Sequence, residues 1–358
     1  MRNSPGSRFR PAVEHLEARE VPASFTAATV PELIAAIDAA NLTPEADMIS
    51  LAAGKTFTLT LTNLANNDAH GETGLPMIAA GDDLTVIGNG ATIERKDSNW
   101  IYHFRLFDVA AEAALTLQNL TLKNGWAYGF GEESQGGAIR NSGTLNLDGV
   151  TVTKCTAEGS ASEYAAGSAC GGGIYSDGTL NVVNSRIESN SAAGGAGKDA
   201  YRVVNVMTGS VSYYSATPGG DGHGGGISLA GGSAEIRDTT ITGNRAAGGI
   251  GGDGMTATAY YGGYEYVSPG AAGGDARGGG LCCDGGAVSL SGVTVAANQV
   301  QGGAGGAGVK GEGRGANGVG LGGGIFIAPE AAVGIDAFTL THAKKNHAST
   351  ADDNISGL

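Results

Sequence analysis

An internal repeat constrains the fold of this chain more than any other feature of its sequence. Five related segments, most of which open with three glycines followed by Ile or Leu, recur along the chain. They begin at Gly136, Gly171, Gly224, Gly278 and Gly322, and an earlier half-copy begins at Ala113. Such a repeat indicates a stack of similar coils, each of which buries its apolar face only against its neighbours.

Each copy carries two pairs of mostly apolar residues that predict two short β-strands. In the copy from Gly136 the pairs are Leu145 with Leu147 and Val150 with Val152. The spacing of two within a pair is the alternation of a strand with one buried face, and the jump of three between pairs predicts a bend. The bend position is occupied by Asn119, Gly149, Asn184, Asp238, Gly292 and Ala337. All but the alanine tolerate a left-handed backbone, so the repeat predicts a parallel β-helix.

A column of asparagines accompanies the repeat. Asn190, Asn244 and Asn298 occupy the same position in three successive copies, and Cys155 stands in this column one copy earlier. Stacked side-chain amides form hydrogen bonds from one coil to the next. We therefore interpret the asparagines as a structural ladder rather than as a ligand site.

The composition excludes several classes of function. Glycine accounts for 64 of the 358 residues, and the formal net charge is −14. Binding to nucleic acids or to anionic membranes requires clustered Lys and Arg, so neither is expected. No segment reaches the roughly 20 apolar residues of a membrane-spanning helix. No apolar stretch typical of a secretory signal is visible near the start of the sequence.

The pattern GGGI…(I/V)xxN resembles the repeat of polymorphic outer membrane proteins and related right-handed β-helix surface proteins. The segment ATVPELIAAIDAANLTPEADMISLAAGKTFTLTLT is similar to the N-terminal capping module of many bacterial surface chains, and VEHLEAREVPA resembles a short leader of large exported bacterial proteins. Together these matches cover roughly residues 11–347. The resemblance implies a right-handed, single-stranded parallel β-helix and an extracellular or cell-surface location. It implies little about activity, because one fold serves many functions.

The sequence predicts the following organisation. The first part, residues 1–22, is a leader or flexible N-terminus, and residues 23–80 form an N-terminal cap and the first coil. In this cap, Pro31 suits a first helical position, and Leu33, Ile34 and Ile37 give one apolar face. The β-helix covers residues 81–347, with inserts at about 195–223, 249–277 and 301–321, and residues 348–358 are a polar tail. We leave open whether this tail covers the last coil.

The three glycine-rich inserts leave their coils at the same corner, so we expect them to project from one side of the solenoid as extended or mobile loops. They hold most of the tyrosines of the chain. The candidate contact residues are Tyr213, Tyr214, Tyr260, Tyr261, Tyr264 and Tyr266, with Tyr201 nearby. Tyrosine among Gly and Ser is typical of recognition surfaces. Alternatively, the rings cover the flank of the solenoid and hold the inserts down.

Little in the sequence indicates catalysis or metal binding. The outward positions of the strand pairs contain one acid, Glu235, and one base, Arg186, which we expect to form a surface ion pair. No cysteine or histidine spacing is typical of zinc, and no cofactor motif has its strand-to-helix context. Cys155 and Cys170 could form a disulfide or remain thiols, and the adjacent Cys282 and Cys283 are not expected to pair.

These observations favour a non-enzymatic surface or secreted protein whose loops bind glycans or cell-surface proteins. A polysaccharide lyase or hydrolase with a site built from the inserts is the alternative, because such enzymes need clustered carboxylates or basic residues. A purely architectural spacer of the cell envelope is a third hypothesis. The sequence does not indicate the oligomeric state.

Overall fold

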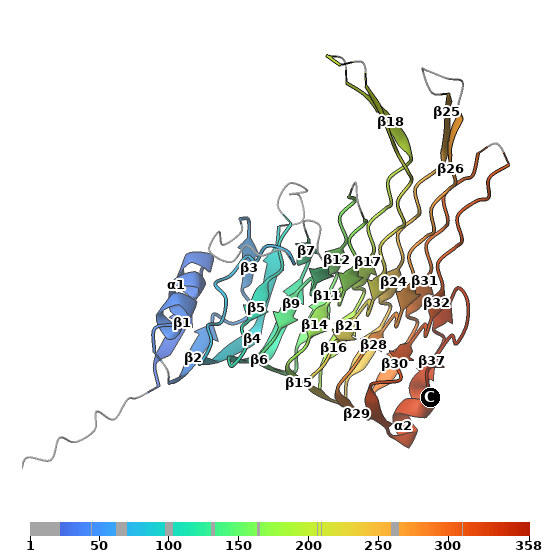
Figure 1. Cartoon of the computed structure of the whole chain (residues 1–358). Helices are drawn as coiled ribbons and strands as arrows, with labels where there is room; N and C mark the ends of the chain where they lie inside the picture. The colour runs from blue at the N-terminus through green and yellow to red at the C-terminus, as the bar shows by residue number, and fades with distance from the viewer. Residues whose placement is uncertain are drawn as a thin grey trace, which may run out of the picture.

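The computed structural model shows a parallel β-helix (Figure 1). It describes residues 22–43, 45–61, 70–96, 103–129, 133–162, 165–205, 207–208, 210–258, 265–309 and 311–358. Successive coils lie side by side from one end of the stack to the other, and their strands pair in parallel. The predicted fold class is therefore confirmed.

A helix closes the N-terminal end of the stack. Helix α1 (Val30–Ala40) begins after Thr29, whose hydroxyl accepts a hydrogen bond from the Glu32 N–H. Leu33 and Ile37 are fully buried against the first strands, as the apolar spacing predicts. The strands beside it are β1 (Ser24–Ala27), β2 (Ala46–Leu51) and β3 (Thr56–Leu59).

Four parallel sheets form the walls of the β-helix. A bent fifteen-stranded sheet contains β1 to β3 and the strand pairs of the repeat. Its other strands are β4 (Asp83–Arg95), β6 (Ala114–Lys123), β10 (Thr144–Asp148), β11 (Thr151–Thr153), β15 (Thr179–Val183), β16 (Arg186–Glu188), β22 (Ser233–Arg237), β23 (Thr240–Thr242), β29 (Ala287–Ser291), β30 (Thr294–Ala296), β34 (Ala332–Ile335) and β35 (Ala343–Lys344). Beyond it along each coil lies a six-stranded sheet. Its strands are β7 (Trp126–Tyr128), β12 (Thr156–Glu158), β17 (Ser191–Ala193), β24 (Arg245–Ala247), β31 (Gln299–Gln301) and β36 (His347–Ala348).

The other two walls are a five-stranded and a seven-stranded sheet. The five-stranded sheet consists of β8 (Ser134–Gln135), β13 (Ala169–Cys170), β20 (Gly222–His223), β27 (Ala276–Arg277) and β32 (Gly320–Leu321). The seven-stranded sheet consists of β5 (Phe107–Val109), β9 (Ile139–Asn141), β14 (Ile174–Ser176), β21 (Ile227–Leu229), β28 (Leu281–Cys283), β33 (Ile325–Ile327) and β37 (Ile355–Ser356). Two antiparallel hairpins stand outside the walls. They are β18 (Tyr201–Val204) with β19 (Val211–Tyr214), and β25 (Met255–Thr258) with β26 (Glu265–Ser268).

The bends within the bent sheet are as the sequence predicts. Five of the six bend residues have φ between 48° and 66°; they are Asn119, Gly149, Asn184, Asp238 and Gly292. The register follows the apolar pairs, so that Leu145 pairs with Leu180 and Ile241 with Val295, and all four side chains are fully buried. One continuous core runs along the inside of the stack.

The sixth bend position differs from the repeat. Ala337 begins helix α2 (Ala337–His342) instead of a strand, and Phe338 and Leu340, which the repeat places inside, are each 45 % exposed. Helix α2 lies between β34 and β35 of this coil, so that Ala343 of β35, rather than Leu340, pairs with Val295. Asp336 is the N-cap of the helix, and its carboxylate accepts a hydrogen bond from the Thr339 N–H. Hydrogen bonds from the Thr339 side chain and N–H hold the pKa of the Asp336 carboxyl below its usual value.

Residues 348–358 take part in the last coil. Strand β37 pairs with β33, and Ala351 forms a bridge to Leu321. Ser356 donates a hydrogen bond from its hydroxyl to Asp352 at 2.8 Å.

The asparagine column forms a continuous ladder inside the stack. The Nδ2 of Asn190 donates to Oδ1 of Asn244, Asn244 donates to Asn298, and Asn298 donates to Asn346, each at 3.0 Å. The backbone N–H of Cys155 donates to the Asn190 amide, which places Cys155 in the same column. The structural interpretation of these residues thus agrees with their contacts, and Asn346 extends the ladder beyond the predicted members.

Candidate functional site

The inserts form an ordered array of extended segments, which we call the arms. Figure 1 shows the arms and the two hairpins projecting together from one side of the solenoid. The outgoing arms comprise residues 194–200, 248–254 and 302–308, and the returning arms comprise residues 217–221, 271–275 and 315–319. Their common direction agrees with the prediction that all inserts leave at one corner.

Backbone hydrogen bonds join neighbouring arms at every third residue. The Gly194 N–H donates to Ala247 at the end of β24, and the N–H groups of Gly197 and Ala200 donate to Ile250 and Asp253 of the next outgoing arm, each at 2.8 Å. A three-residue period without hydrogen bonds inside the segment is the pattern of a polyproline-II-type helix. The arms are thus extended, one of the two forms expected from the sequence, and their backbones hold one another in place.

Glycine is required where the arms touch. The N–H of Gly249 donates to Gly220, and a Cβ atom added to Gly249 would overlap the carbonyl oxygen of Gly195. Gly303 stands in the same relation to Gly249. Backbone therefore packs directly against backbone, closer than any side chain permits, and this explains much of the glycine content of the chain.

We expect Gly249→Ala to loosen the arms while leaving the β-helix folded. The methyl group has only rigid backbone to displace, which destabilises the array by about 3 kcal/mol. Hydrogen exchange of the arm amides, followed by mass spectrometry, is then expected to rise by about 100-fold. Gly313→Ala is the matched control, because a Cβ atom at Gly313 has open space around it. Equal exchange rates in the two variants would contradict the packing described here.

Tyrosine rings of the two hairpins stack on one another. Tyr201 lies on Tyr214 within one hairpin, with ring centroids 4.7 Å apart, and Tyr213 lies on Tyr266 of the other hairpin at the same distance. The hydroxyl groups of Ser215 and Tyr266 are 2.9 Å apart, which joins the hairpins further. These rings pack along and between the hairpins rather than on the flank of the solenoid. Tyr260, Tyr261 and Tyr264 lie outside the described residues.

The first hairpin exposes apolar side chains. Met207 is 94 % exposed, and Val203, Val204 and Tyr214 are each 43–44 % exposed. Single exposed apolar residues are common on protein surfaces, whereas a local group of them indicates a contact surface. The described part of this hairpin therefore exposes a local group of apolar side chains to solvent.

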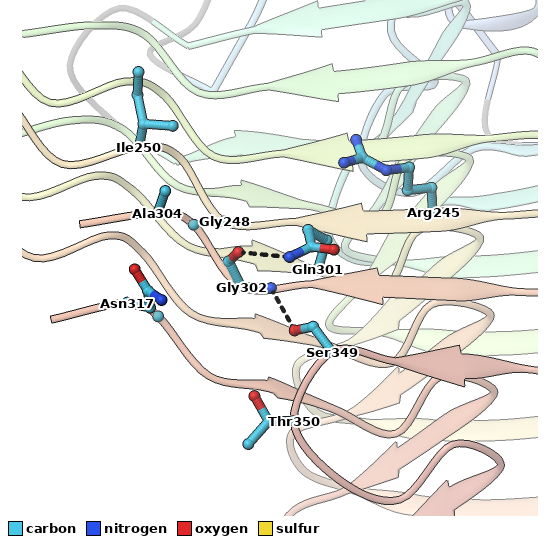
Figure 2. Close-up of a pocket in the computed structure, with 11 residues that line it drawn as sticks. Arg245, Gly248, Ile250, Gln301, Gly302, Ala304, Asn317, Ser349 and Thr350 are labelled. Carbon is cyan, nitrogen blue, oxygen red and sulfur yellow. Dashed lines mark hydrogen bonds between the residues drawn. The ribbon is translucent and has the colours of Figure 1, made fainter. Parts of the chain in front are cut away.

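A polar groove lies where the arms leave the solenoid (Figure 2). Its volume is about 440 Å³, and amide, hydroxyl and guanidinium groups line it; these belong to Arg245, Gln301, Asn317, Ser349 and Thr350. Gly302 donates its N–H to the Ser349 hydroxyl at 3.0 Å, and Gln301 donates to the Gly302 carbonyl at 3.2 Å. The sequence analysis did not single out these residues, because strand ends, an arm and the last coil contribute them separately.

The ion pairs of Arg186 and Glu235 on the outward face of the bent sheet lie within single strands. Arg186 and Glu235 do not pair across coils; each binds a neighbour in its own strand, Glu188 at 2.7 Å and Arg237 at 3.0 Å. Side chains two residues apart lie on the same face of a strand, which brings each of these pairs within reach without any contact between coils. Exposed pairs of this kind contribute little to stability.

All four cysteines are buried free thiols. Cys155 lies in the main core, where burial raises the pKa of its thiol to about 12. The Cys170 thiol donates to the Glu133 carboxylate at 2.9 Å. The sequence left open whether Cys155 and Cys170 form a disulfide or remain thiols, and in the structure both are free thiols.

Among the residues that the structure describes, no helix combines the length and the apolar character needed to cross a membrane. No protein-family model and no curated protein sequence matches the chain.

Proposed function

We propose that the chain is a non-enzymatic glycan-binding protein that acts outside the cell or on a cell surface. The β-helix is its scaffold, the arms extend from it, and the tyrosine hairpins contact the glycan. The resemblance of the repeat to polymorphic outer membrane proteins supports the location. The observation that carries the proposal is the pair of joined hairpins, with stacked tyrosines, held far from the solenoid wall.

The chemistry of the arms suits a carbohydrate chain. Sugars present apolar C–H faces, which pack on aromatic rings, and hydroxyl groups, which need donors and acceptors. The hairpins supply the rings of Tyr213, Tyr214 and Tyr266, and the groove at the base of the arms supplies amides and hydroxyls. The backbone contacts between arms fix these groups before binding, which reduces the entropy lost on association.

Replacing the six candidate tyrosines by serine is expected to weaken glycan binding while the chain still folds. These are Tyr213, Tyr214, Tyr260, Tyr261, Tyr264 and Tyr266. We expect the apparent affinity for an insoluble glycan to fall by at least about tenfold, because aromatic side chains dominate such contacts. Co-sedimentation measures the affinity, and a thermal melt measures the stability.

Tyr128→Ser serves as the control, since Tyr128 lies half-buried in β7 on the solenoid wall. We expect it to retain binding. Unchanged binding by the sixfold variant would contradict the proposed contact surface. A lowered melting temperature together with retained binding would show that the rings are structural.

A further inference from the structure

A cluster of three chemically distinct side chains lies outside the arms, at the corner between the five-stranded and seven-stranded sheets. His223 belongs to β20, Cys282 belongs to β28 of the next coil, and Asp284 follows β28 directly. In the described part of the chain, this is the one place where three or more His, Cys, Asp or Glu side chains converge in this way. One ligand atom of each lies within 4.8 Å of the others.

The separations between these atoms fit a single metal ion. The Cys282 Sγ atom is 3.3 Å from Oδ2 of Asp284, and Nδ1 of His223 is 3.8 Å from the same oxygen. Zinc bonds of about 2.0–2.3 Å in tetrahedral geometry place neighbouring ligand atoms roughly 3.4–3.6 Å apart. Small side-chain adjustments would thus bring all three atoms to bonding distance of one ion.

The Asp284 carboxylate of the cluster is not paired with the arginine of the neighbouring coil. Nδ1 of His223 faces this carboxylate and is the nitrogen placed to bind an ion, whereas the buried Nε2 lies on the other side of the ring. Arg277, which stands next to His223 in the ladder, lies over the Phe326 ring at 5.2 Å and pairs with Asp275. The Asp284 carboxylate therefore meets a thiol and an imidazole rather than a guanidinium.

We propose that His223, Cys282 and Asp284 bind one zinc ion, with solvent in the fourth position. Nitrogen, sulfur and oxygen ligands of this kind are those that zinc takes in proteins. The His223 and Asp284 side chains are 18 % and 29 % exposed, so that ion and solvent reach the site. Zinc takes cysteine as the thiolate, so binding releases the Cys282 thiol proton, which the thiol otherwise donates to the Asp284 carboxylate.

The ion would stabilise the stacking of two coils from the outer side of the solenoid wall. Its ligands come from two consecutive coils, His223 from one and Cys282 with Asp284 from the next, so one ion connects two turns of the stack. The site lies in the solenoid wall and does not depend on the glycan proposal.

Titration of the full-length, metal-free chain with zinc tests the proposal. We expect the wild type to bind one tightly held zinc ion and to melt at a higher temperature with zinc than without. With cobalt, we expect the near-ultraviolet absorption band of a thiolate–cobalt bond. His223→Gln and Cys282→Ser are each expected to weaken zinc binding by at least about tenfold, and Cys282→Ser to abolish the cobalt band.

His347→Gln is the matched control, because His347 also faces a carboxylate, Asp353 at 3.3 Å, but without a sulfur ligand. It is expected to bind zinc as the wild type does. Circular dichroism and melting without metal establish that each variant folds. Asp284→Asn provides a second test if Cys282→Ser fails to fold. Wild-type affinity in a folded His223→Gln variant, or a wild type that binds no zinc, would overturn the proposal.

Discussion

Ile241→Asp is expected to unfold the middle of the β-helix at room temperature or to leave it barely stable. Ile241 is fully buried in β23, where it pairs with Ile187 on one side and Val295 on the other. A carboxylate there has neither solvent nor a partner, and we expect the free energy of unfolding to fall by about 5 kcal/mol. Denaturant unfolding followed by far-ultraviolet circular dichroism measures the loss.

Thr240→Asp is the control for this register. Thr240 is the preceding residue of the same strand, points outward, and pairs with Arg186 in the adjacent coil. An aspartate there meets solvent and a positive charge, so the variant is expected to stay within about 0.5 kcal/mol of the wild type. A shift of one residue in the register exchanges the two faces of a strand. If Thr240→Asp unfolded the chain and Ile241→Asp did not, the register would be wrong.

Asn244→Asp is expected to have the second-largest effect. The Asn244 amide accepts from the Asn190 N–H and side chain, and its Nδ2 donates to the Ile187 carbonyl and to Asn298. A carboxylate would retain the two accepted bonds but set an oxygen against two other oxygens inside the stack. We expect a loss of about 4 kcal/mol, measured by the same denaturant unfolding.

Asn181→Asp provides the comparison in the preceding coil. Asn181 also donates to another asparagine, Asn146 at 2.8 Å, but on the half-exposed outer face. Solvent replaces that bond, so the change is expected to lower stability by less than about 1 kcal/mol. Similar losses in both variants would show that the inner ladder has no special role.

Much of the fold could be predicted from the sequence because its stabilising contacts repeat. The spacing of Leu145, Leu147, Val150 and Val152 gives the strand pair, its bend and the face that is buried, and the same pattern recurs in the next coils. Left-handed residues at the bend confirm the register. Helix α1 was predictable from its own apolar face.

The remaining features depend on contacts that have no local pattern. Phe338 and Leu340 follow the repeat, yet they lie in a helix that Asp336 caps, and Ala343 takes the strand position beside Val295. The glycine-rich composition of the inserts is the same for mobile loops as for ordered ones. The arms are ordered because backbone hydrogen bonds join each arm to its neighbours, and no local sequence pattern encodes those bonds. His223 and Cys282 are distant in the chain and meet only because successive coils stack.

Incubation of the wild-type chain with a panel of insoluble glycans and polyuronides tests the central claim most directly. Protein in the pellet and soluble sugar in the supernatant are measured in the same tube. We expect the protein to sediment with at least one glycan and to release no sugar. Release of soluble sugar would contradict a non-enzymatic role and favour a lyase or hydrolase, and failure to sediment with any glycan would favour an architectural spacer.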